Sequence, residues 1–171
     1  MKKHAVLIPG LAALVLAGLA SSTHADKKQE SGSFDAAYVK RDVQPIAEGH
    51  ILMLAEATGV NKGGGKIDGF SVSARDIADI HKGNGPDSGY VFFSHGGDVQ
   101  TVKINGKITT VMKDGQPQTT LAGTWEVVSA TGALAGSKGK GTYAGYFTAE
   151  DKYHIDWKGW IDGPEAMASR K

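Results

Sequence analysis

The chain has 171 residues, of which 40% are hydrophobic and 22% are charged, with 24 glycines, 5 prolines and 0 cysteines. A formal net charge of +1 without a clustered basic patch argues against a nucleic-acid partner. Because cysteine is absent, disulfides and thiol catalysis are excluded, and stability must come from apolar burial and backbone hydrogen bonds.

The first 25 residues have the pattern of a signal peptide. Lys2 and Lys3 precede an apolar run from Ala5 to Ala20, and Thr23-His24-Ala25 provides a small-x-small cleavage pattern. The run contains proline and glycine and is shorter than the ~20 apolar residues of a membrane-spanning helix, so no stable membrane anchor is expected. We therefore predict a signal peptide over residues 1–25 and a periplasmic or secreted protein.

The remaining residues are enough for one domain. Removing 25 of 171 residues leaves 146, with 17 basic and 18 acidic side chains after the loss of Lys2 and Lys3. Residues 26–45 are predicted to form a polar, extended N-terminal arm, disordered over Asp26–Ser33 and packed outside the domain over Phe34–Pro45. The domain itself is predicted over residues 46–163, followed by a tail over residues 164–171.

Short runs rich in Val, Ile, Thr and aromatic residues alternate with glycine-rich turns, as is typical of an antiparallel meander. In the strand Tyr153–Ile161, Tyr153, Ile155, Trp157 and Ile161 share one face, and the polar residues share the other. Thr101–Met112 alternates in the same way. Further strands are predicted over His50–Thr58, Phe70–Ile77, Gly89–Ser94, Thr120–Ser129 and Gly139–Phe147. Turns are predicted at Asn61–Gly65, Gly83–Gly89, His95–Asp98 and Lys113–Pro117.

One position within these strands admits two interpretations. Asn105-Gly106 is either the turn of a type I′ hairpin, since both residues tolerate positive φ, or a bend in one long strand. We favour the bend, because glycine within a strand often marks a barrel corner.

The strand pattern predicts an all-β fold, a single closed antiparallel β-barrel of about eight strands, with a β-sandwich as the alternative. The interior of such a barrel is either filled by side chains or holds one small ligand.

The segment Gly123–Gly139 resembles the conserved hairpin of the allene oxide cyclase-like and dirigent-like barrel superfamily. That family carries a Gly-Gly-Thr-Gly-x-Phe-x-Gly turn, which Thr131-Gly132 and Gly136 match. Ser129 and Ala130 stand in place of the preceding glycines, and Leu134 replaces the aromatic residue. The resemblance implies an eight-stranded barrel, and a cavity for a small apolar or aromatic molecule if the function is similar. Plant members cyclise a fatty-acid epoxide or hold phenoxy radicals during coupling. No catalytic residue is carried over.

Glu56 is the first candidate for chemistry. It follows an apolar run, Ile51–Ala55, so its carboxylate is expected either to face a packed surface with a raised pKa or to pair with Arg75 or Lys62 at the wet end of the strand. The paired alternative is the favoured one.

Arg75 and His95 are the other two candidates. Arg75 and Asp76 are neighbours on opposite faces of a strand, so only one of the two can line a barrel mouth. His95 with Asp98 suggests either an acid-base dyad or a plain hairpin tip around two glycines.

No sequence signature points to a metal or cofactor. His50, His81, His95 and His154 never occur at a metal-ligand spacing, and neither a phosphate-binding loop nor a nucleophile elbow is present. No metal or cofactor is therefore expected.

Three functions stay open at this point. The first is an exported barrel that binds a small apolar or aromatic molecule or serves as an envelope structural component. The second is an isomerase or cyclase acting on an oxidised lipid-like substrate in the barrel cavity. The third is an interaction module that forms a homo-oligomer.

Overall fold

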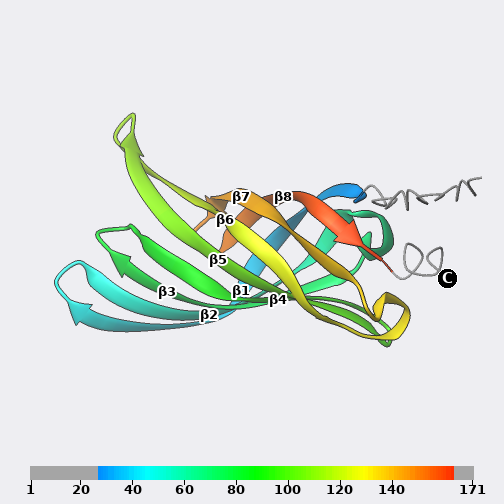
Figure 1. Ribbon diagram of the computed structural model, residues 1–171. Coiled ribbons are helices and arrows are strands. Elements are labelled where there is room, and N and C mark those ends of the chain that lie inside the picture. Colours follow the sequence, from blue (N-terminus) through cyan, green and yellow to red (C-terminus); the bar gives the residue numbers. More distant parts are fainter. Residues whose placement is uncertain (1–26, 164–171) are drawn as a thin grey trace, which may run out of the picture.

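Eight antiparallel strands close into a barrel in the computed structural model, which describes residues 27–163 (Figure 1). Each strand pairs with the next along the chain, and β8 pairs with β1. The predicted signal peptide and C-terminal tail lie outside the described residues. Between residues 27 and 163, no helix is long and apolar enough to span a membrane.

The strands are joined by tight turns and two short 3-10 helices, η1 and η2. Their bounds are β1 Gln29–Ala47, β2 His50–Gly63, η1 Gly65–Ile67, β3 Ser71–His81, β4 Gly85–His95, β5 Asp98–Lys113, β6 Gln116–Ala130, η2 Gly132–Leu134, β7 Lys138–Ala149 and β8 Lys152–Asp162. The predicted all-β closed barrel of about eight strands is confirmed.

The prediction of an N-terminal arm is wrong. Residues 29–45 belong to β1, which pairs with β2 on one side and with β8 on the other and so closes the barrel. Phe34 and Ala36 face the core and are only 5% and 4% exposed. Glu30, one of the polar residues that suggested an arm, is partly buried at the capped end, and the barrel begins at Gln29 instead of at residue 46.

The other predicted strands are present but longer than expected. Strand β4 begins at Gly85 instead of Gly89, and β2 continues through Asn61 to Gly63, so the predicted turns are shorter. Three long hairpins, β1–β2, β3–β4 and β5–β6, extend beyond the β7–β8 turn at one end of the barrel (Figure 1). We call this the hairpin end, and the opposite end, where η1 and η2 lie, the capped end.

The inner and outer faces follow the predicted alternation. Tyr153, Ile155 and Trp157 of β8 are buried, each at most 7% exposed. Strand β5 is continuous through Gly106, which pairs with Asp87 of β4 and Gly123 of β6, so the bent strand is confirmed and the hairpin is not formed.

A buried asparagine holds the capped end together. Asn61 is 0% exposed, and its Nδ2 donates to the carbonyl oxygens of Gly63 (2.8 Å) and Ile67 (2.9 Å). Its Oδ1 accepts a hydrogen bond from Nε1 of Trp157 at 2.9 Å. The same indole meets Trp125 edge to face, with ring centroids 5.9 Å apart. One side chain thus connects β2, η1 and β8.

The turn that carries the family resemblance has the backbone that its glycines predict. Gly132 and Gly136 have φ of +60° and +82°, a region that residues with a Cβ rarely adopt. Leu134, in place of the family's aromatic residue, is 4% exposed and packs into the core.

We expect Asn61→Ala to lower the free energy of unfolding by about 2–4 kcal/mol, because it leaves buried groups of Trp157, Gly63 and Ile67 without a partner. Urea denaturation measures the change. Asn105→Ala, on the exposed face of β5, is the matched control and should be nearly neutral. Equal unfolding free energies for the two variants would contradict the role given to Asn61.

Candidate functional site: the barrel cavity

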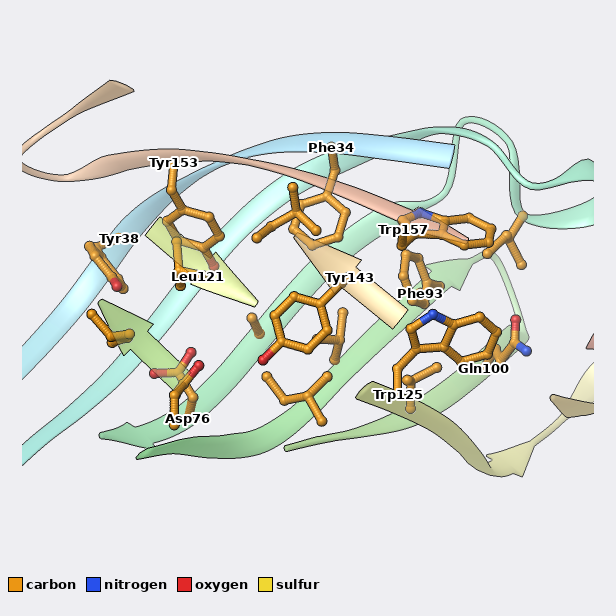
Figure 2. Close-up of a pocket in the computed structure, with 18 of the residues that line it drawn as sticks. Phe34, Tyr38, Asp76, Phe93, Gln100, Leu121, Trp125, Tyr143, Tyr153 and Trp157 are labelled. Carbon is orange, nitrogen blue, oxygen red and sulfur yellow. The ribbon is translucent and has the colours of Figure 1, made fainter. Parts of the chain in front are cut away.

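The barrel interior contains a cavity of about 60 Å³ (Figure 2). Its volume is less than half that of the ~150 Å³ apolar cavity that is known to take benzene, so a ring-sized ligand requires some side-chain movement. Most of the interior is therefore filled. The lining residues are Phe34, Tyr38, Ile67, Ala74, Asp76, Asp87, Val91, Phe93, Gln100, Val102, Ile104, Ile108, Leu121, Trp125, Tyr143, Tyr153, Ile155, Trp157 and Ile161.

Two carboxyl groups line this otherwise mainly apolar cavity. Asp76 of β3 faces inward, and Asp87 of β4 is 5% exposed. Asp87 pairs with Ala78, the next inward-facing position after Asp76 on β3, so the two acids occupy neighbouring positions of the inner wall. No basic side chain is among the described residues that line the cavity.

Burial makes both acids hard to ionise. Desolvation, with the charge of Asp87 as a smaller cause, raises the pKa of Asp76 to about 7. Desolvation alone raises the pKa of Asp87 to about 6. Both carboxyls therefore titrate near neutral pH, where one can hold a proton while the other is charged.

Three tyrosines stand near the acids. Tyr38 and Tyr153 lie at the same end of the cavity as Asp76, and the hydroxyl of Tyr143 points toward that end (Figure 2). Burial, followed by the charges of Asp76 and Asp87 among the smaller causes, raises the pKa of all three phenols. The three phenols therefore stay protonated at neutral pH and can donate hydrogen bonds.

Gly106 makes room for one of these hydroxyls. A Cβ at Gly106 would lie 2.1 Å from the Tyr143 hydroxyl oxygen and 2.6 Å from the carbonyl oxygen of Ala122. Since Gly106 is the register partner of Asp87, the Tyr143 hydroxyl lies against the strand position next to Asp87. The bend residue predicted from sequence therefore also shapes the cavity.

Two polar atoms here have no protein partner. Asp87 Oδ1 and the Tyr143 hydroxyl are buried without a hydrogen bond within the described part of the chain. Nearly all buried polar groups in proteins are hydrogen-bonded, and each orphan costs about 1–3 kcal/mol. Both lie on the wall of one cavity, which is the arrangement of a binding site.

Contacts between β1 and the β7–β8 turn surround the lining residue Tyr38. The backbone N–H of Tyr38 donates to the carbonyl oxygen of Asp151 at 2.9 Å. Arg41 donates to the carbonyl oxygen of Glu150 at 3.2 Å and lies over the Tyr38 ring, 5.4 Å from its centroid. Tyr38 in turn packs against Tyr153, with ring centroids 5.4 Å apart.

The structure places the predicted candidates outside the cavity. Glu56 and Arg75 face each other on the outer surface, with 3.9 Å between Oε2 and Nε, which is the paired alternative given for Glu56. Of the neighbours Arg75 and Asp76, it is Asp76 that lines the interior. His95 is exposed at the end of β4 and pairs with Asp98 across a tight turn, as in a hairpin tip, while Asp98 Oδ1 accepts from the backbone N–H of Ala133 in η2 at 2.7 Å.

Asp87 was missed because it lies in a Gly-Asn-Gly-Pro-Asp segment that reads as a turn. One signal could have found it: Asp87 continues the inward-facing series of Val91 and Phe93 at intervals of two. In residues 27–163, no group of three or more His, Asp or Glu side chains is placed to hold a metal ion.

No protein-family model matches the chain, and no curated protein matches it in sequence. Among solved structures, the chain is similar to the pterocarpan synthase dirigent protein GePTS1. The sequence identity is 14% and the TM-score is 0.43, with 92% of this chain and 98% of that chain covered. The strand pairing described above establishes the closed eight-stranded barrel itself.

We expect Asp76→Asn to stabilise the protein at pH 8 by on the order of 3 kcal/mol and to change little at pH 4. The folded state holds the Asp76 proton up to about pH 7, whereas the ordinary value is 3.8, so the free energy of unfolding of the unaltered protein falls as pH rises through this window. The Asp76→Asn variant lacks the part of this fall in unfolding free energy that comes from Asp76. Urea denaturation at a series of pH values measures it.

Asp114→Asn, in the exposed β5–β6 turn, is the control and should follow the unaltered protein. His154 adds a separate fall above its ordinary pKa of 6.5, because hydrogen bonding to Asp35 raises its pKa, but this affects all three proteins equally. Parallel pH profiles for Asp76→Asn and Asp114→Asn would contradict a desolvated Asp76.

Proposed function

We propose that the barrel binds a small, mainly apolar molecule in its interior, with the polar end of that molecule between the Asp76–Asp87 pair and Tyr143. The observation that carries the proposal is the pair of buried, unpartnered atoms, Asp87 Oδ1 and the Tyr143 hydroxyl, on one otherwise mainly apolar cavity wall. A ligand that hydrogen-bonds to both removes the cost of leaving them unpaired.

The shape of the interior favours this function over a purely structural barrel. The capped end is packed with indole and phenyl rings around Trp125, Trp157 and Phe93, whereas the unpartnered groups lie nearer the hairpin end, as does the lining residue Tyr38. A barrel that served only as an envelope component gains nothing from two buried carboxyls without a basic partner. The N-terminal sequence supports binding in the periplasm or outside the cell.

A second candidate function is an isomerase or cyclase that uses the same cavity. The specific observation in its favour is that the pKa values of Asp76 and Asp87 are raised to about 7 and about 6, close to the value that suits a general acid or base at neutral pH. One protonated and one ionised carboxyl can move a proton from one atom of a substrate to another without a cofactor. Loss of turnover in Asp76→Asn with binding retained would separate this function from binding alone.

We expect saturable binding of at least one of four small probes: butylamine, 1-butanol, benzylamine and benzyl alcohol. Trp125 and Trp157 line the cavity, so their fluorescence reports occupancy, and calorimetry gives the dissociation constant. Ala74→Leu fills space on the cavity wall, where Ala74 is 3% exposed, and should weaken binding about tenfold or more.

Ala144→Leu makes the same substitution on the exposed face of β7 and is the control, which should bind normally. The thermal midpoint of Ala74→Leu shows whether it still folds, since overpacking costs about 1–3 kcal/mol. Absence of binding for all four probes, or equal binding in the two variants, would contradict an interior site.

A further inference from the structure

The polar end of the cavity offers several oxygen atoms that can accept hydrogen bonds. Asp87, 5% exposed, presents an unpartnered Oδ1, and Tyr143, 8% exposed, presents an unpartnered hydroxyl oxygen. Asp76 adds a second carboxyl from the neighbouring strand. Three side chains on three strands, β3, β4 and β7, therefore offer oxygen atoms to the same space.

The register places these oxygens close together. Asp87 lies opposite Gly106, and the Tyr143 hydroxyl occupies the space where a Cβ of Gly106 would be, at 2.1 Å. Asp76 is one inward position along β3 from Ala78, the other register partner of Asp87. The neighbouring strands β3 and β4 are about 4.8 Å apart, and the Tyr143 hydroxyl reaches across the interior to Gly106, the β5 partner of Asp87, so the three side chains face the same space.

The charge of this end is not balanced by the protein. Among the residues that line the cavity in the described part of the chain, none is Lys, Arg or His. Arg41, which lies over the ring of the lining residue Tyr38, is engaged with Glu150. When both carboxyls are ionised, the positive charge that would pair with them must come from a bound molecule.

An alkylammonium group fits this arrangement better than a hydroxyl does. An ammonium has three N–H donors and no acceptor, which matches three acceptors from Asp76, Asp87 and Tyr143. A hydroxyl can donate to one carboxylate and accept from Tyr143, but it supplies no positive charge and leaves the second carboxylate without a partner. The rings of Tyr38 and Tyr153 stand at the same end of the cavity, and aromatic faces attract cations by up to ~2 kcal/mol when water is excluded.

The lining on both sides of the acids is mainly apolar, so the rest of the molecule must be apolar too. Val91 and Ile104 lie on the capped side of Asp87, and Ile108 and Leu121 lie on its hairpin side. We propose that the cavity is a site for a small organic cation, a primary amine on a short aliphatic or aromatic body, bound with its ammonium group between Asp76, Asp87 and Tyr143. This inference rests on the proposed function, because it names the ligand class of the same cavity.

The test compares isosteric pairs: butylamine with 1-butanol, and benzylamine with benzyl alcohol. At pH 8 we expect the better-fitting amine to bind at least about tenfold more tightly than its alcohol, measured by calorimetry. The preference should disappear in Asp87→Asn and in Asp76→Asn, and persist in the control Asp114→Asn. Both cavity variants keep the size of the side chain and remove only its charge, so a circular-dichroism melt is expected to show them folded.

Proton linkage gives an independent readout. At pH 6, binding of the amine should release protons from the carboxyl pair, seen as a calorimetric enthalpy that depends on the ionisation enthalpy of the buffer, whereas the alcohol should release none. Alcohols that bind as tightly as amines, or an amine preference unchanged in both Asn variants, would overturn the organic-cation site while leaving the interior binding site intact. No binding of any of the four compounds would overturn the proposed function itself.

Discussion

Closing eight strands into a barrel sends every second side chain into a single interior, and the rest of this structure depends on how that interior is filled. Toward the capped end, Trp125 and Trp157 are packed edge to face, and Asn61 satisfies the indole N–H of Trp157 together with the turn carbonyls. Toward the hairpin end, the same inner face carries Asp76 and Asp87 instead of aliphatic residues. The barrel therefore surrounds a pair of acids with mainly apolar side chains.

The acid pair lowers the stability of the folded protein, because two carboxyl groups are kept in a mainly apolar interior. Desolvation disfavours the charged form of both carboxyls, and no basic lining residue within the described chain offsets it. Aliphatic residues of similar size at these positions would pack without this cost. Departures of this kind from a well-packed core are typical of functional sites, where a bound molecule supplies what the protein lacks.

The face of each central strand could be predicted from sequence, because alternation over β8 and β5 separates apolar from polar residues without reference to the rest of the chain. The bend at Gly106 followed from glycine's lack of a Cβ. Strand β1 could not be predicted in the same way, since its outer residues are polar and its pairing partner, β8, lies at the far end of the sequence. Only closure of the barrel turns residues 29–47 from an apparent arm into a strand.

The residues of the candidate site were harder to predict from the sequence than the fold. Glu56 was singled out because of the apolar run before it, yet Ala55 and Ala57 take the inward positions and Glu56 faces outward. Successive side chains of a strand point to opposite faces, so a shift of one position decides whether an acid faces the interior or the solvent. Asp76 was recognised only as one of two neighbours that could face inward, and Asp87 was assigned to a turn. The unpartnered state of the Tyr143 hydroxyl depends on the register of β4 with β5, which no local pattern specifies.

The central claim is that the interior holds two desolvated carboxyls without a basic partner. The most direct test is a carboxyl-carbon NMR titration of the ligand-free protein labelled at aspartate, with the two resonances assigned by their loss in the Asn variants at positions 76 and 87. We expect midpoints near the raised values of about 7 for Asp76 and about 6 for Asp87. If both resonances instead titrate near the ordinary 3.8, the carboxyls are hydrated or paired, and the cavity is not the site described here.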